Sequence, residues 1–132
     1  MFRIKRVYEP PAQEDGFRVL VDRLWPRGLS KERAAVDYWA REIAPSDALR
    51  KWYRHDPDKW AEFRRRYFEE LDADPEGVAA LRAELGRGLN TIVYGSKEER
   101  LNNATALVEY LEARRDVGSA GTPSRAPARR KR

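Results

Sequence analysis

The chain has 132 residues, of which 41% are hydrophobic and 37% charged, and it contains no cysteine. A domain of this length buries roughly two-thirds of the surface that its unfolded chain exposes, and this hydrophobic content is too high for a disordered protein. The lack of cysteine excludes disulfides, zinc-thiolate sites and a cysteine nucleophile. We therefore expect a single globular domain.

The net charge of +5 is unevenly distributed along the chain. Residues 1–115 carry 22 basic and 21 acidic residues, whereas residues 116–132 carry five basic residues and one acidic residue. This last segment is also rich in Gly, Pro, Ser and Ala, a composition typical of disorder. We expect a folded domain over 1–115 followed by a disordered basic tail over 116–132.

The amino terminus, MFRIKRV, lacks the apolar stretch of a secretory signal peptide. No segment approaches the roughly 18 consecutive apolar residues of a membrane span. We therefore expect a cytoplasmic protein that does not contact a membrane.

Three segments have the patterns of β-strands. Residues 2–7, FRIKRV, alternate apolar and basic residues, which is typical of a strand at the edge of a sheet. Residues 17–22 contain Val19, Leu20 and Val21 in sequence, as in a strand covered on both faces, so this strand is placed near the centre. Residues 91–94, TIVY, form the third predicted strand.

Helix signals follow each of the later strands. Ser30 is a plausible N-cap for a helix that ends at Pro45 and buries Val36, Trp39, Ala40 and Ile43. Ser46 can cap a short helix, and Asp56 with Pro57 can begin a longer one that buries Trp60, Phe63, Tyr67 and Leu71. A further helix is predicted over 76–85.

The last predicted helix begins directly after the strand 91–94. Ser96 with Glu99 three residues later forms a capping box, and Leu101, Ala104, Val108 and Leu111 supply the buried stripe. Strands joined by such helical crossovers are parallel. The predicted fold is therefore an α/β domain with a small, partly parallel sheet of three to four strands covered by helices.

Two loops leave the carboxyl ends of the predicted parallel strands, where open α/β sheets bind their ligands. The first is RLWPRG, residues 23–28, and the second begins GSKEE at Gly95. Arg23 and Arg27 can donate paired hydrogen bonds to a phosphate or carboxylate, and Lys97 and the backbone near Ser96 add positive charge. Trp25 can form an aromatic wall, with Pro26 and Gly28 fixing the shape of the loop.

Asp22 and His55 are the candidates for proton transfer. Asp22 lies at the strand end, and His55, the only histidine, precedes Asp56 near a helix start. Structural interpretations remain open: Asp22 can pair with Arg23 or Arg27, and Trp25 can fill the core. One histidine with two nearby aspartates gives no recognised metal-ligand spacing, so neither a metal nor a cofactor is predicted.

Two familiar motifs do not match at Ser96. The segment YGSKEE lacks the second glycine of G-x-S-x-G and the glycine spacing of a phosphate-binding P-loop. We therefore favour a role for Ser96 as a helix cap over a role as a nucleophile.

The segments RVLVDRLWPRGLSKE, IAPS-x-x-LRKWY-x-HDP-x-x-W-x-x-F-x-x-RY and NNA resemble the YeaO-like proteins of domain-of-unknown-function family 488 over about residues 3–113. The resemblance implies a small bacterial cytoplasmic α/β protein without an established reaction. Its motif residues are Asp22, Arg23, Trp25, Pro26, Arg27, Gly28, His55, Asp56, Pro57, Asn103 and Ala104. Family members commonly have an Ala-Ala-Lys/Arg-Asp-like turn where this chain has Gly95-Ser96-Lys97-Glu98.

Two functions from different classes follow from these observations. The first is binding or turnover of a small anionic ligand, held by Arg23, Trp25, Arg27, Gly28, Ser96, Lys97 and Asn103, with His55 or Asp22 available for proton transfer. The second is a nucleic-acid-associated or regulatory module without catalysis, in which the basic tail contacts phosphates. A protein-interaction module is a third possibility, and the sequence indicates neither the oligomeric state nor whether the protein is an enzyme.

Overall fold

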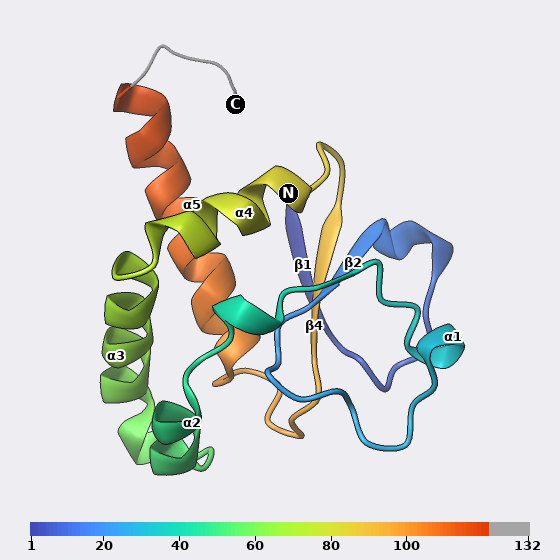
Figure 1. Ribbon diagram of the computed structural model, residues 1–132. Coiled ribbons are helices and arrows are strands. Elements are labelled where there is room, and N and C mark those ends of the chain that lie inside the picture. Colours follow the sequence, from blue (N-terminus) through green and yellow to red (C-terminus); the bar gives the residue numbers. More distant parts are fainter. Residues whose placement is uncertain (122–132) are drawn as a thin grey trace.

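The computed structural model describes residues 1–121, with side chains up to residue 114 (Figure 1). The strands are β1 (Phe2–Arg6), β2 (Phe17–Leu20), β3 (Tyr38–Trp39) and β4 (Asn90–Tyr94). The α-helices are α1 (Lys31–Ala34), α2 (Asp47–Tyr53), α3 (Trp60–Asp72), α4 (Pro75–Glu84) and α5 (Asn103–Gly121). Short 3-10 turns lie at Gln13–Asp15, Arg41–Ile43 and Pro57–Lys59.

The strands form one sheet in the order β1-β4-β2-β3, and every neighbouring pair is parallel. This confirms the predicted edge position of β1 and the inner position of β2. It also confirms that β2 and β4 are parallel, with Leu20 opposite Val93 at their carboxyl ends. The small α/β fold predicted from the sequence is therefore correct.

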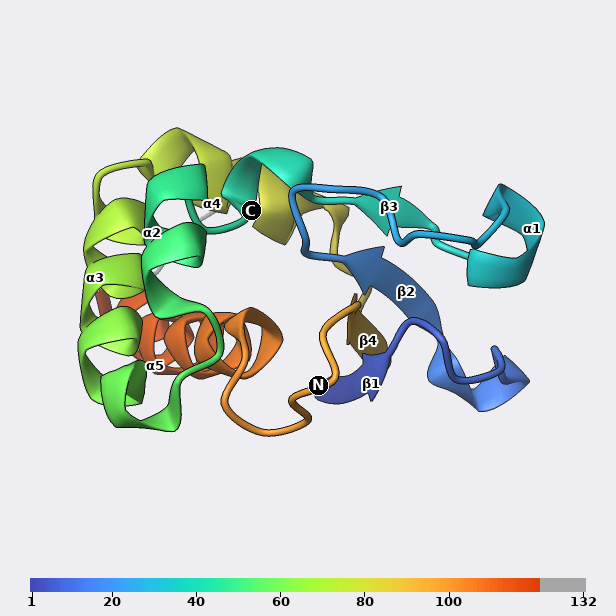
Figure 2. The same cartoon turned by 90° about the horizontal axis from the view of Figure 1, so that it is seen from below.

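The helices cover one face of the sheet. Val19, Val21, Ile92 and Tyr94 pack from the strands into a core with Phe63, Tyr67 and Leu71 of α3 and with Ala104, Leu107, Val108 and Leu111 of α5. Figure 2 shows α2, α3, α4 and α5 grouped on this side. The predicted stripe of α3 is confirmed at its three buried positions, while Trp60 is only partly buried.

The other face is covered by loops and by the single turn of α1 (Figure 2). A second cluster there contains Val7, Leu20, Ala34 and Val93, with Trp25, Leu29, Val36 and Trp39 packed against it. The loop that carries RLWPRG is therefore anchored by its own apolar side chains on the side of the sheet away from the long helices.

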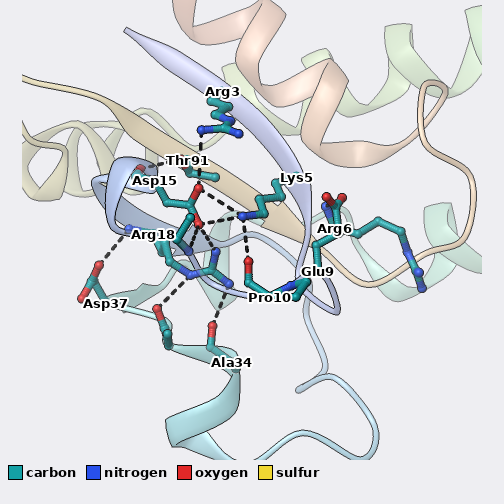
Figure 3. A network of polar contacts seen from close by, with 12 residues as sticks. Arg3, Lys5, Arg6, Glu9, Pro10, Asp15, Arg18, Ala34, Asp37 and Thr91 are labelled. Atoms are coloured by element: carbon teal, nitrogen blue, oxygen red, sulfur yellow. Dashed lines mark hydrogen bonds and ion pairs between the residues drawn. The ribbon is translucent and has the colours of Figure 1, made fainter.

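A buried polar network lies beside this second cluster (Figure 3). The fully buried Asp15 carboxylate accepts hydrogen bonds from Lys5 Nζ at 2.9 Å and from Arg18 Nη1 at 2.7 Å. Arg18 also donates to the carbonyls of Ala34 and Ala35, at 2.8 and 3.0 Å, and so connects β2 to the end of α1. Burying a charged group without a partner is unfavourable, and this network supplies each of these buried charges with an ion pair and hydrogen bonds.

The predicted helix from Ser30 to Pro45 is wrong after its first turn. Ser30 caps α1 as predicted, its Oγ accepting from the Arg33 N–H at 3.1 Å. The helix then ends because Ala35 adopts a left-handed conformation with φ 51°. The chain continues as β3, whose Trp39 pairs with Leu20, so apolar residues assigned to a helix face instead add a strand to the sheet.

The predicted start of the last helix is also wrong. Residues 95–102 form a loop, and α5 begins at Asn103, where the buried Asn102 side chain accepts from the Thr105 N–H at 3.0 Å. The helix extends through Gly121, past the predicted domain end at 115. The rest of the predicted basic tail, 122–132, lies outside the described residues. Within residues 1–121 no helix has the length and apolar character needed to cross a membrane.

Candidate functional site

A cavity of about 450 Å³ opens where β2 and β4 end. Its wall is formed by residues 22–27 after β2, by the end of α2 with residues 54–55, and by residues 95–96 after β4. The two loops that the sequence places at one sheet edge thus line the same cavity. The volume is within the usual range of small-molecule sites.

Asp22 connects three elements at this cavity. Its Oδ2 accepts a hydrogen bond of 2.7 Å from the Gly95 N–H, and its Oδ1 accepts one of 3.1 Å from Asn103 Nδ2. Asn103 also donates to the Val21 carbonyl at 2.9 Å. Within residues 1–114 Asp22 forms no ion pair, so the alternative that it pairs with Arg23 or Arg27 is wrong.

The electrostatic environment of Asp22 is unusual for an aspartate. Burial raises the pKa of its carboxyl above the ordinary value, although hydrogen bonds from Asn103 and Gly95 and the charges of His55 and Arg50 act in the opposite direction. The contacts within the protein therefore do not fully replace the water that the carboxylate has lost. A side chain in this state can bind a donor from a ligand or exchange a proton.

Arg23 and Trp25 line the cavity but also support it. Arg23 donates from Nε and Nη2 to the carbonyls of residues 45 and 44, at 3.3 and 3.0 Å. Trp25 donates from Nε1 to the Leu29 carbonyl at 2.7 Å, and its ring meets Trp39 edge-on at 5.4 Å. Trp25 packs against the second cluster, as its structural interpretation predicts, and it also lines the cavity; its contact with a ligand stays a prediction.

Arg27 and Lys51 are exposed cations on the cavity wall. The backbone carbonyl of Arg27 accepts from the Tyr8 hydroxyl at 2.8 Å, which ties the RLWPRG loop to the β1–β2 connection. Neither the guanidinium of Arg27 nor the ammonium of Lys51 has a hydrogen bond or ion pair in the part of the chain whose side chains are described. These two groups are available to a ligand.

The end of α2 supplies cations that sequence reasoning missed. Arg50, Lys51 and Arg54 all line the cavity, together with Arg23 and Arg27. Arg50 pairs with Asp47 at 3.1 Å and Arg54 donates to the Lys51 carbonyl at 3.1 Å. The basic residues of LRKWYR were the feature of the sequence that could have indicated these cations. Only the tertiary structure, however, brings this helix end beside the strand ends.

His55 lies on the wall in a strained segment. Arg54 and His55 both have positive φ, 49° and 58°, a conformation that costs a residue with a Cβ roughly 1–2 kcal/mol. The imidazole is exposed and lies edge-on to Tyr53 at 5.8 Å. Asp56 caps the following turn as predicted, accepting from the Asp58 N–H at 3.0 Å. The described residues contain no cluster of three or more potential metal-ligating side chains.

The remaining predicted site residues differ in position. Ser96 and Asn103 line the cavity, whereas Gly28 and Lys97 do not. The predicted positive helix end at Ser96 is wrong because α5 begins seven residues later, and the Ser96 hydroxyl instead donates to the Glu98 carbonyl at 3.1 Å. Gly28, with φ 82°, shapes the turn that ends the RLWPRG loop.

The charged side chains that line the cavity are mainly cationic. Five Arg and Lys side chains line it, and Asp22 is the one acidic residue among the lining residues that the structure describes. Aromatic rings of Tyr8, Trp25, Tyr53 and Phe63 supply apolar surface beside these charges. The arrangement suits an organic molecule that carries a negative charge.

The amino-acid sequence is similar to those of known proteins. Residues 1–128 match the family described as the inactive DUF488-N3 subclade. An uncharacterised protein of Mycobacterium tuberculosis H37Rv is 42% identical over 112 residues, which are 85% of this chain and 94% of that protein. The uncharacterised protein YeaO of Escherichia coli is 39% identical over 109 residues, 83% of this chain and 95% of that protein. No solved structure matches the chain. These similarities confirm the resemblance read from the sequence, and the chain belongs to the YeaO-like DUF488 family.

Proposed function

We propose that this protein binds a small organic anion, bearing a phosphate or carboxylate group, in the cavity at the ends of β2 and β4. The observation that carries the proposal is the set of five cationic side chains on the cavity wall, with Arg27 and Lys51 lacking a partner within the described side chains. An exposed cation without a protein partner retains its full capacity for a charge-assisted hydrogen bond to a ligand.

The positions of the two available cations define where the anion binds. Arg27 belongs to the loop after β2, and Lys51 belongs to the last turn of α2. Arg27 presents a planar fork that matches a carboxylate or phosphate, and Lys51 adds a point charge. An anion held between two elements also gains the rigidity of both, since the loop is held by Trp25 and α2 is capped by Ser46.

Binding without turnover is the form of this function that we favour. The family to which residues 1–128 match is described as inactive. Both oxygens of Asp22 accept hydrogen bonds that hold the loop and α5 in place, which gives this carboxylate a structural role independent of proton transfer. If turnover does occur, Asp22 is the proposed proton acceptor and the ligand would not be recovered unchanged after incubation with the protein.

Thermal unfolding of the full chain tests the proposal. The protein is heated with phosphate, phosphate esters and small carboxylates at constant ionic strength, so that general screening is the same in every sample. A ligand present at about 100 times its Kd stabilises the folded state by about 2.7 kcal/mol, which raises Tm by several degrees.

Variants locate the site. Arg27→Ala and Lys51→Ala are each expected to weaken binding by about tenfold, the loss typical of a hydrogen bond to a charged group. Arg87→Ala is the matched control, because Arg87 is exposed and precedes β4 at the opposite edge of the sheet. Equal stabilisation of the wild type and of the Arg27→Ala/Lys51→Ala double variant would contradict the proposed site.

A further inference from the structure

We infer that the ligand of this cavity is a hydroxylated organic anion, and that Asp22, together with Ser96 and Tyr53 of the same cavity wall, accepts hydrogen bonds from the ligand's hydroxyl groups. The inference rests on the proposed function and specifies its ligand class. It is carried by the hydrogen-bonding state of the oxygen atoms that line the cavity beside the cations.

The carboxylate of Asp22 has unused acceptor capacity. Each of its oxygens accepts one hydrogen bond within the protein, from Gly95 and from Asn103, whereas a carboxylate has about four acceptor positions. Burial raises the pKa of Asp22 despite these contacts and the nearby charges of His55 and Arg50. The carboxylate on the cavity wall thus has acceptor positions that no donor among the described residues fills, and a donor from a ligand can fill them.

Two hydroxyl groups that line the same cavity, those of Ser96 and Tyr53, can also only accept hydrogen bonds from a ligand. The Ser96 hydroxyl donates to the Glu98 carbonyl at 3.1 Å, and the Tyr53 hydroxyl donates to the Leu101 carbonyl at 2.7 Å. Both residues line the cavity. A hydroxyl has a single proton, so Ser96 and Tyr53 present only lone pairs to a ligand. Three oxygen-bearing side chains of this wall can therefore accept hydrogen bonds from a ligand but cannot donate to it.

Hydroxyl groups fit this requirement better than ammonium groups. An ammonium would interact favourably with Asp22 but would be repelled by the five cationic side chains that line the same cavity. A hydroxyl donates without carrying charge. The ligand chemistry that satisfies both parts of the wall is an anionic group toward Arg27 and Lys51 with neutral hydroxyls toward Asp22, as in phosphorylated polyols and sugar acids.

Two pairs of compounds with equal charge test the inference on the full chain by titration calorimetry. Glycerol 3-phosphate is compared with propyl phosphate, and threonate is compared with butyrate. The members of each pair share a carbon skeleton and an anionic group and differ in their hydroxyls. We expect the hydroxylated member of at least one pair to bind at least about tenfold more tightly. Preference within the first or the second pair identifies the anionic group as phosphate or carboxylate.

The Asp22→Asn variant assigns the preference to this residue. It removes the negative charge and replaces one acceptor oxygen with a donor, so affinity for the hydroxylated compound should fall by about tenfold while affinity for its partner stays the same or rises. A general disturbance of the cavity would weaken both compounds equally and would contradict the assignment. Equal affinities within both pairs for the wild type would overturn the subsite and leave anion binding intact. Binding of none of the four compounds would overturn both proposals.

Discussion

The Asp22 carboxylate accepts a hydrogen bond of 2.7 Å from the N–H of Gly95, which joins the residues that follow β2 and β4 at one edge of the sheet. Arg6, at the end of β1, holds the same loop from the other side. Its Nε donates to the Ser96 carbonyl at 2.8 Å and its Nη2 to the Gly95 carbonyl at 3.2 Å. The cavity wall after β4 is thus fixed to both strands that neighbour β4.

The close approach at Gly95 leads to the first prediction. A Cβ at this position would lie 3.1 Å from Asp22 Oδ2, closer than side chains normally pack. In Gly95→Ala the carboxylate must move away from the methyl group and its hydrogen bond to residue 95 must lengthen. We expect the free energy of unfolding, measured by urea denaturation, to fall by about 1–2 kcal/mol.

Gly88→Ala is the control for this effect. A Cβ at Gly88 would meet no atom within 4 Å, and its φ lies outside the left-handed region. Alanine there restricts the unfolded chain and is expected to leave stability unchanged or to raise it by up to about 1 kcal/mol. If Gly95→Ala and Gly88→Ala were equally stable, the contact between Asp22 and Gly95 would not constrain the loop.

The second prediction concerns acid and the buried network at Asp15. Burial raises the pKa of Asp15, but hydrogen bonds from the Ala12 N–H, Lys5 and Arg18 outweigh this effect and lower it from 3.8 to about 2. A carboxyl with a lowered pKa in the folded state stabilises the fold fully above the unfolded pKa, and this stabilisation is lost as the pH falls from about 4 through 2.

Asp15→Asn should therefore differ from the wild type most at neutral pH. It leaves Lys5 and Arg18 buried without a counter-charge, a change that typically costs about 3–5 kcal/mol. The difference in free energy of unfolding should narrow as the pH is lowered from 5 to 2. Glu14→Gln is the control, because Glu14 is the neighbouring acidic residue and its side chain is exposed. A difference that stayed constant with pH would exclude Asp15 as the titrating group.

The strands were predictable because their side-chain patterns record which faces are covered. Val19, Leu20 and Val21 are fully buried, as expected of an inner strand packed on both sides. The alternation in β1 puts Lys5 on the basic face of the strand, yet Lys5 is only 9% exposed because the turn at Gln13–Asp15 folds over it and supplies Asp15. Alternation identifies the two faces of a strand, but a segment outside the strand decides what covers them.

The segment 36–43 could not be assigned from its own residues. Apolar residues at helical spacing also fit a short strand and a turn, and no glycine marks Ala35 as the end of α1. Contacts with β2 decide the outcome: the Ala40 N–H donates to the Leu20 carbonyl at 2.8 Å, and Trp39 Nε1 donates to the Asp22 carbonyl at 2.7 Å. Tertiary pairing overrides local propensity here.

The sequence predicted some of the residues of the candidate site but not others. The rule that ligands bind at the carboxyl ends of parallel strands led to Asp22, Arg23 and Arg27, and all three line the cavity. Lys51 and Arg54 were missed because they follow no strand and resemble ordinary solvated helix residues. Their position depends on how α2 packs against α3, which the spacing of charges in the sequence does not encode.

The third prediction concerns the cap that fixes α2. Ser46 Oγ accepts from the Leu49 N–H at 3.2 Å and donates to Glu70 Oε2 at 2.6 Å, while the Ser46 N–H donates to Glu70 Oε1 at 2.9 Å. Ser46→Ala removes the cap and one link to α3, and should lower the free energy of unfolding by about 1–2 kcal/mol. Ser30→Ala is the control, since Ser30 caps only the single turn of α1 and should cost less. The reverse order of losses would show that the link to Glu70 does not stabilise α2.

The last prediction concerns the strained backbone at Arg54 and His55. At an ordinary helical position glycine is less stable than alanine by about 1 kcal/mol, but at a positive φ the Cβ is the source of strain. With φ 58° at residue 55, His55→Gly should be more stable than His55→Ala by about 1 kcal/mol in urea denaturation. Ala79→Gly, at an exposed position within α4, should show the usual loss.

Both His55 variants lack the imidazole, so any difference in their stability reports on the backbone alone. Equal stability, or greater stability of His55→Ala, would mean that residue 55 leaves the positive-φ region at little cost. The predicted order would instead mean that the fold holds residue 55 in a costly conformation where α2 meets the cavity. Such strain persists only when the surrounding contacts impose it, and here it places Arg54 and His55 on the wall that the anion is proposed to contact.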